Sequence, residues 1–229
     1  MFSIRTLLGN YPKLFFSIYG LKKKNRDLFI KKETELIISA YPRTANTFFI
    51  VALEHIQKKP ISIAHHLHVP ALPIRGVQKK IPVVVIVRKP EEAIASLVIR
   101  ETHIQIKQAI KAYIDFHEPL LRCKNEILIT DFYRVIEDFP SVISDINSKF
   151  DLKLDNYSTD NPIDNKVIFS KIEEINKRFN KNKLIESMVS RPSENRGQLK
   201  EHYIRLIKQE KYSKNLKKCN FIYENLISQ

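Results

Sequence analysis

Short, wholly apolar runs of strand-forming residues alternate with helix-like patterns along the first two thirds of the chain. The clearest run is Val83–Val87, five β-branched residues in succession, and Leu36–Ala40 has the same apolar character. A strand without polar alternation is buried on both faces, as strands are in a parallel sheet covered by helices. The alternation therefore predicts an α/β fold with three layers, a central parallel sheet with helices on both faces.

Two further apolar runs, Ile61–Ala64 and Ile127–Thr130, are the other strand candidates. Helical spacing follows three of the four strands, and Pro90 with two glutamates after it is a favourable helix start. From about Lys166 onward only helical periodicity remains, which predicts a helical C-terminal third. No repeat or linker divides the chain, so we expect one domain over residues 1–229, with a basic and apolar arm (1–33), a core (34–200) and a C-terminal helix (201–229).

The charge balance and the cysteine content narrow the classes of partner. The chain has 39 Lys and Arg residues against 25 Asp and Glu residues, for a formal charge of +14. Such a surplus favours nucleic acid, acidic lipid, a polyanionic glycan or a phosphorylated cofactor, although a solvated Lys-rich surface explains part of it. Only Cys123 and Cys219 occur, without metal-ligand spacing, so we expect no disulfide framework and a reducing, cytoplasmic location.

The N-terminal arm combines apolar and basic residues. Leu14–Tyr19 is apolar apart from Ser17, and Lys13 and Lys22–Lys24 flank it. This run is shorter than the roughly 18 apolar residues of a transmembrane helix, and it is unlike a signal peptide. A basic, aromatic helix suits peripheral contact with the inner surface of an anionic membrane. Packing on the sheet edge and a mobile arm are the alternatives.

Two strand–turn–helix junctions carry basic residues and hydroxyls. Tyr41–Phe49 (YPRTANTFF) follows the first strand, and Arg88–Pro90 follows a later one, with Ser96 eight positions after Arg88. Free backbone N–H groups and the positive end of the helix dipole meet at such junctions and build anion sites. In a parallel sheet both junctions lie at the carboxyl ends of strands, where ligands bind, and so do His65, His66, His68 and Thr130. Two such sites predict a ligand with two separate phosphates.

Several common nucleotide-binding and catalytic motifs are missing. The first loop contains no glycine and does not match G-x-x-x-x-G-K-[ST]. The sequence also lacks G-x-G-x-x-G and the nucleophile elbow G-x-S-x-G. The expected nucleotide site is therefore P-loop-like in its strand–turn–helix geometry, without the P-loop sequence.

At these residues the chain resembles the sulfotransferases that use 3′-phosphoadenosine 5′-phosphosulfate (PAPS) as donor, and the compact bacterial members in particular. The first loop is similar to the family's Y-P-K-S-G-T-T-W, which binds the 5′-phosphosulfate. Arg88 and Ser96 resemble the arginine–serine pair that binds the 3′-phosphate. Pro192–Lys200 is similar in place to the basic segment that closes over the nucleotide, so the resemblance spans about residues 36–200.

The resemblance implies a role for each matching residue. Counted from Arg88 without a gap, the general-base histidine is His66, and a gapped match chooses His68. Arg43 is expected to stabilise the leaving phosphate, and Arg88 with Ser96 to hold the 3′-phosphate. The implied donor-binding residues are Arg43, Thr44, Ala45, Asn46, Thr47, Phe48, Arg88, Ser96, Arg191, Ser193 and Arg196, and no metal is expected.

Two departures from the family loop bear on this chemistry. Sulfuryl transfer builds charge on the leaving phosphate, which fixed hydrogen-bond donors stabilise. Arg43 stands where the family has lysine, and a guanidinium cannot give up its proton. Ala45 replaces glycine, and its Cβ at a left-handed turn position costs roughly 1 kcal/mol. These departures predict slow turnover, and either a different path of the loop or looser binding.

The sequence thus predicts a sulfotransferase that moves sulfate from PAPS to a hydroxyl of a glycan or lipid, releasing 3′,5′-adenosine bisphosphate, with no nucleic-acid partner. The individual residues have structural alternatives: Arg88 can pair with Glu91 or Glu92, and Thr44 or Asn46 can serve only as a helix cap. Two other functions stay open. One is a kinase-like, nucleotide-dependent phosphotransferase, and the other is a non-catalytic basic module for nucleic acid or an anionic membrane.

Overall fold

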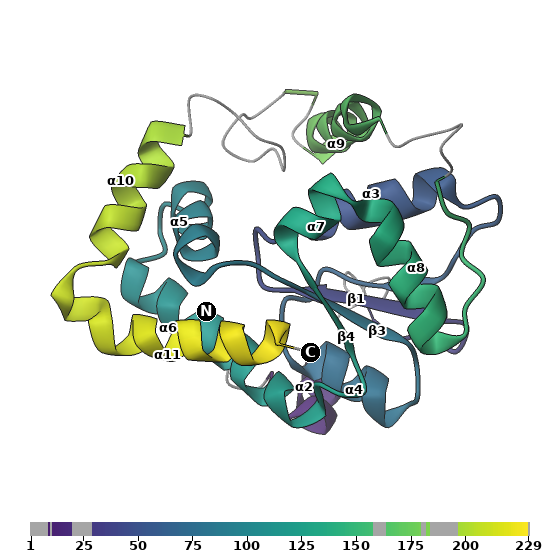
Figure 1. Ribbon diagram of the computed structural model, residues 1–229, viewed down its shortest axis with the longest axis horizontal. Helices are drawn as coiled ribbons and strands as arrows, with labels where there is room; N and C mark the ends of the chain where they lie inside the picture. The colour runs from purple at the N-terminus through teal and green to yellow at the C-terminus, as the bar shows by residue number, and fades with distance from the viewer. Residues whose placement is uncertain are drawn as a thin grey trace.

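A sheet of four parallel strands, in the order β2-β1-β3-β4, lies at the centre of the protein (Figure 1). The computed structural model describes residues 9, 11–19, 29–157, 164–179, 182–183 and 197–228. The strands are β1 (Leu36–Ala40), β2 (Ile63–Ala64), β3 (Val83–Val87) and β4 (Leu128–Asp131). The predicted α/β fold with a parallel sheet is confirmed, and each of the four apolar runs overlaps a strand.

Helices connect the strands and continue after the last one. Between the strands lie α3 (Asn46–Ile56), α4 (Ala71–Gln78), α5 (Pro90–Arg100), α6 (Ile106–His117) and the 3₁₀-helix η2 (Glu118–Cys123). After β4 follow α7 (Phe132–Glu137), α8 (Phe139–Phe150), α9 (Asn165–Phe179), α10 (Gly197–Ile207) and α11 (Glu210–Ile227). The expected helical character of the C-terminal third is confirmed for its described residues.

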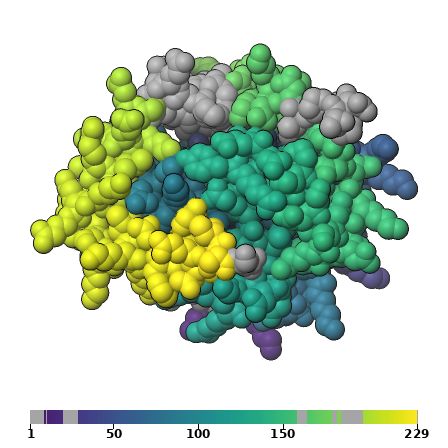
Figure 2. Space-filling model, viewed as in Figure 1, coloured from purple at the N-terminus to yellow at the C-terminus, as the bar shows by residue number. Residues whose placement is uncertain are grey.

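Each face of the sheet has its own hydrophobic core, because successive side chains of a strand point to opposite faces. Ile37 and Val85 belong to the core that includes buried residues of α4, α5, α6 and α11. Ile38 and Ile86 belong to the core on the other face, with residues of α3, α8 and α9. Figure 2 shows α10 and α11, in yellow-green and yellow, along one side of the molecule. The predicted three layers are therefore present.

The helix of the N-terminal arm, α2 (Pro12–Tyr19), packs against α4. Its Phe15 is fully buried and stacks on Tyr19 with ring centroids 4.7 Å apart. The helix is thus apolar towards the core, but its Leu14 and Ile18 are exposed, as is Tyr11 directly before it. Across the described ranges, no helix has the length and apolar character that crossing a membrane requires.

Candidate functional site

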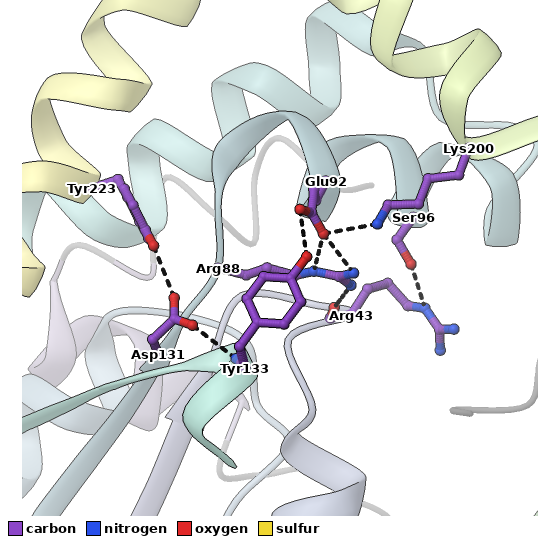
Figure 3. A network of polar contacts seen from close by, with 8 residues as sticks. All are labelled: Arg43, Arg88, Glu92, Ser96, Asp131, Tyr133, Lys200 and Tyr223. Atoms are coloured by element: carbon purple, nitrogen blue, oxygen red, sulfur yellow. Dashed lines mark hydrogen bonds and ion pairs between the residues drawn. The ribbon is translucent and has the colours of Figure 1, made fainter. Parts of the chain in front are cut away.

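The loops that follow β1, β2 and β3 carry the candidate residues, and they meet at the carboxyl edge of the sheet. The side chain of Arg88, directly after β3, reaches the loop after β1, where its Nη1 donates to the main-chain oxygen of Arg43 at 3.0 Å. Arg43 Nε in turn donates to Ser96 Oγ on α5 at 3.3 Å (Figure 3). The two junctions recognised in the sequence therefore form one connected site.

The loop after β1 leads into the start of α3, where the first backbone N–H groups precede the intrahelical hydrogen bonds. Arg43 has a φ of 69° and Ala45 a φ of 59°, so both adopt the left-handed conformation. The first hydrogen bond of α3 runs from Phe49 N to Ala45 O at 2.9 Å, which leaves the N–H groups of Asn46, Thr47 and Phe48 without an intrahelical partner. Together with the helix dipole, these groups favour an anion. Ala45 therefore adopts the left-handed turn conformation expected from the sequence, although alanine, unlike glycine, has a Cβ there.

The side chains of this loop differ in what they can offer a ligand. Thr44 is buried, and its hydroxyl donates to the Tyr41 carbonyl. Both amide atoms of Asn46 are buried and have no hydrogen-bond partner among the described residues. The Phe48 ring lies in the core, so Phe48 can contribute only its backbone N–H. The alternative that Thr44 or Asn46 caps α3 is wrong, because the residue before the helix is Ala45 and no side chain caps it.

The guanidinium of Arg88 is held on several sides. Nε and Nη2 donate to Glu92 Oε2 at 3.3 and 3.0 Å, so the expected structural pairing with Glu92 is present. The Phe132 ring lies 3.8 Å from the guanidinium carbon, a cation–π distance. The Tyr113 hydroxyl also donates to the main-chain oxygen of Arg88 at 2.8 Å. Arg88 is thereby fixed in one orientation at the end of β3.

Glu92 accepts hydrogen bonds from two further residues in addition to Arg88. The Tyr133 hydroxyl donates to Oε1 at 2.6 Å, and Lys200 Nζ donates to Oε2 at 2.8 Å (Figure 3). Burial alone would raise the pKa of Glu92. The hydrogen bonds from Lys200 and Tyr133 and the charge of Arg88 outweigh burial and lower the pKa to about 2. Glu92 is therefore a carboxylate at any physiological pH.

Three histidines follow β2, and two of them have unusual backbones. His66 has a φ of 60° and His68 a φ of 50°. His66 Nε2 lies 3.2 Å from Thr47 Oγ1, and its Nδ1 contacts Nδ1 of His65. His68 Nδ1 lies 2.8 Å from the Ala40 carbonyl, which can only accept, so this nitrogen carries the proton. Within the described ranges, these side chains belong to no group arranged to hold a metal.

Burial, followed by the charges of His68, His65 and Arg100, lowers the pKa of His66 to about 3. The His66 ring is therefore neutral at physiological pH and has a lone pair with which to accept a proton. The strained residues His66 and His68 lie directly beside the loop after β1. Strain of this kind persists only where the surrounding structure holds it, and it is common at functional sites.

Most of the site residues were predicted from the sequence, but the hydrogen bonds that join them through Glu92 were not. Arg191, Ser193 and Arg196 lie outside the described residues. The four-residue spacing of Arg88 and Glu92 was the only sequence signal for the acidic centre of the site. Tyr133 and Lys200 come from segments far away in the sequence, and no pattern linked them to Glu92.

Comparisons with known proteins give distant structural likenesses. No family model matches the chain, and no curated protein matches its sequence. Among solved structures, the chain is similar to mouse sulfotransferase SULT7A1 complexed with PAP, with a TM-score of 0.48 and 13% sequence identity. This likeness covers 90% of this chain and 89% of that chain. A likeness this distant assigns no function, so the functional proposal rests on the residues of the site.

Proposed function

We propose that this chain is a sulfotransferase that transfers the sulfuryl group of PAPS to a hydroxyl of a glycan or lipid. The observation that carries the proposal is the contact between the loop after β1, which contains Arg43, and the segment from Arg88 to Ser96. Arg88 donates to the main chain of Arg43, and the Arg43 side chain donates to Ser96. The residues that resemble the family's 5′-phosphosulfate loop and its 3′-phosphate pair therefore lie in a single connected site. This site is at the edge of the sheet where parallel sheets bind ligands.

The donor supplies the sulfuryl group and leaves as 3′,5′-adenosine bisphosphate, as the acceptor oxygen bonds to sulfur and the sulfur–phosphate oxygen bond breaks. The chain's residues provide the electrostatics of this step. Arg43 and the N–H groups of Asn46 and Thr47 would stabilise the charge that grows on the leaving phosphate. Arg88 and Ser96 would bind the 3′-phosphate, since a guanidinium matches phosphate oxygens in geometry and charge.

His66 is the proposed general base that takes the proton of the acceptor hydroxyl. It contacts Thr47, which belongs to the proposed phosphosulfate loop, and its ring is neutral because burial lowers the pKa to about 3. The negative charge of a bound donor would raise this pKa and make the ring a stronger base. His68 is the alternative, because its Nδ1–H is donated to Ala40 and Nε2 is then the accepting nitrogen.

A nucleotide titration read by melting temperature tests the proposal. At a concentration of 100 Kd, 3′,5′-adenosine bisphosphate should stabilise the protein by about 2.7 kcal/mol. For a chain of this size that is a rise in Tm of roughly 5–10 °C. Arg88→Ala should abolish the rise, whereas Arg75→Ala on α4 should leave it unchanged. An Arg88→Ala protein that binds the bisphosphate as tightly as wild type would contradict the assignment.

The same titration separates the other candidate functions. Stabilisation by ATP–Mg but not by the bisphosphate would favour a phosphotransferase. Binding of nucleic acid with a steep salt dependence, and no effect of the bisphosphate, would favour a basic module.

We also propose peripheral contact between α2 and the anionic inner surface of a membrane. Tyr11, Leu14 and Ile18 are 63%, 48% and 44% exposed, although Phe15 between them in the sequence is fully buried. Their spacing of three and four residues places them on one side of the helix. Lys13 is exposed beside them, and Lys22–Lys24 follow in the sequence. Exposed apolar side chains bordered by lysines suit the interface of an anionic bilayer, where a lipid acceptor would also lie.

A further inference from the structure

The Glu92 carboxylate gathers donors from three segments that lie far apart in the sequence. Arg88 comes from the end of β3, Tyr133 from the first turn of α7, and Lys200 from the first turn of α10 (Figure 3). The side chain of Glu92 is only 16% exposed and that of Arg88 only 10%. A carboxylate with this many fixed donors is held rigidly and stays ionised, in agreement with a pKa of about 2.

The hydrogen bonds of Arg88 with described residues use three of its five N–H donors and fix the directions of the other two. A guanidinium has five N–H groups. Nε and one N–H of Nη2 are donated to Glu92, and one N–H of Nη1 is donated to the Arg43 main chain. Within the part of the chain that the structure describes, one N–H on each terminal nitrogen therefore has no partner. Phe132 covers the guanidinium 3.8 Å away, so the plane of the fork is set as well.

We propose that Glu92 is a positioning residue that orients the Arg88 fork towards the 3′-phosphate and thereby sets the preference for a 3′-phosphorylated nucleotide. This inference rests on the proposed function, in which Arg88 binds that phosphate. Carboxylates behind a ligand-binding side chain commonly act in this way, by fixing the orientation of the group that touches the ligand. Tyr133 and Lys200 support Glu92, so that α7 and α10 contribute to the site through this single carboxylate.

The alternative is that Glu92 is an internal anion that a phosphate must displace from Arg88. Displacement would take the acceptor away from Tyr133 and Lys200 as well, in a site where Glu92 is mostly buried. A mostly buried carboxylate that loses its hydrogen-bond donors is costly. The positioning role also leaves the charge balance favourable, because Arg88 and Lys200 together carry two positive charges against the one negative charge of Glu92.

The two roles predict opposite changes in phosphate affinity for the variant Glu92→Gln. Removal of a negative charge beside an anion site should strengthen phosphate binding if Glu92 only competes for Arg88. If Glu92 orients Arg88, the same change weakens binding of the 3′-phosphate, because an amide holds the fork less firmly. A nucleotide without that phosphate should not respond. The ratio of the two affinities is therefore the informative quantity.

The experiment is calorimetric titration of the wild-type chain, Glu92→Gln and Glu91→Gln with 3′,5′-adenosine bisphosphate and with adenosine 5′-monophosphate. Glu91→Gln makes the same change of charge one residue away on α5 and is the matched control. We expect Glu92→Gln to weaken bisphosphate binding about tenfold, the lower end of the range known for carboxylates that orient metal ligands. Monophosphate binding should stay within twofold of wild type, and Glu91→Gln should change neither affinity by more than that.

Bisphosphate affinity that is unchanged or higher in Glu92→Gln would overturn the inference, and so would an equal loss for both nucleotides. Arg88→Ala separates this from a failure of the proposed function. If Arg88→Ala keeps wild-type affinity, the proposed function fails. If Arg88→Ala loses the bisphosphate and Glu92→Gln does not, only the inference fails.

Tyr133→Phe keeps the test decisive should Glu92→Gln not fold. It removes one hydrogen bond to Glu92 without any change of charge, so electrostatics predicts no effect on either nucleotide. The positioning role predicts a several-fold loss for the bisphosphate alone. Equal affinities of Tyr133→Phe and wild type for the bisphosphate would contradict it.

Discussion

Four left-handed residues stand beside one another in the candidate site. They are Arg43, Ala45, His66 and His68, and they make up more than half of the seven non-glycine residues with positive φ in the described ranges. Each such residue carries a steric cost of roughly 1–2 kcal/mol. The cost is tolerated because packing and hydrogen bonds hold these two loops in place, as strained residues at binding sites are held. The strained backbone of the site thus lowers the stability of the folded protein. A substitution that relieves the strain should therefore change the free energy of unfolding.

Ala45→Gly should stabilise the protein, although glycine usually destabilises. At a φ of 59° the Cβ of alanine is strained, and its removal should raise the free energy of unfolding by about 0.5–1 kcal/mol. For this chain length that is a rise in Tm of roughly 1–4 °C. The control is Ala112→Gly within α6, where the same change should cost about 1 kcal/mol. A lower Tm for Ala45→Gly would show that the loop is not strained in solution.

His66→Gln should slow sulfuryl transfer by at least about a hundredfold, the usual contribution of a general base. Water can replace the unidentified acceptor, so the assay follows the release of 3′,5′-adenosine bisphosphate from PAPS. Binding of the bisphosphate should stay within a few-fold of wild type, because His66 is not among its proposed contacts. His68→Gln is the matched variant. A larger loss of rate in His68→Gln than in His66→Gln would assign the base to His68.

At the scale of elements, the strands were the most predictable part of the fold. β3 coincides with the predicted run Val83–Val87, because a segment buried on both faces must be apolar throughout. β2 is shorter than predicted and covers only Ile63–Ala64 at the sheet edge, where it pairs with β1 alone. The helix α7 was not predicted. Its six residues are too few for helical periodicity, and it begins where Asp131 accepts a hydrogen bond from Tyr133 N.

The candidate site was predictable where its residues follow strands directly or, as for Ser96, belong to a motif that begins at a strand end. Parallel strands end at one edge, so the positions of Arg43, His66 and Arg88 followed from the strand assignments. The contacts of Glu92 with Tyr133 and Lys200 depend on how α7 and α10 pack beside α5. Tertiary packing of that kind joins distant segments and leaves no periodic trace in the sequence.

The helix α2 should bind vesicles that contain phosphatidylserine. Sedimentation with vesicles of phosphatidylserine and phosphatidylcholine measures the binding, and phosphatidylcholine alone should bind much less because the lysines then lack an anionic surface. Leu14→Ser combined with Ile18→Ser should weaken binding about tenfold, since two apolar side chains no longer enter the interface. Phe221→Ser on α11 is the control, as Phe221 is 62% exposed but lies elsewhere. Equal binding by the double variant would contradict the proposed contact.

At the scale of the whole molecule, histidines whose pKa is lowered by burial link folding to pH, and His66 and His117 have the largest shifts. Burial lowers the pKa of His66 to about 3 and that of His117 to about 4, despite the opposing hydrogen bond of His117 to Tyr113. His117 is fully buried, and its ring lies 4.1 Å from that of Tyr113 and 4.8 Å from that of Phe116 between centroids. Its Nε2 has no hydrogen-bond partner in the described part of the chain. Both rings are therefore neutral in the folded protein.

The free energy of unfolding should fall as the pH drops below about 6.5, the pKa of histidine in an unfolded chain. Between that value and the depressed folded pKa values, the unfolded chain binds more protons than the folded one, so acid favours unfolding. Each histidine contributes up to about 1.4 kcal/mol per pH unit, which predicts a loss of roughly 2–3 kcal/mol between pH 7.5 and 5.5. Urea unfolding at constant ionic strength measures it. His117→Phe should reduce this loss by about 1.4 kcal/mol, whereas His103→Phe, at a side chain that is 76% exposed, should leave it intact. A pH dependence unchanged by His117→Phe would mean that the His117 ring is already protonated, or solvated, in the folded chain.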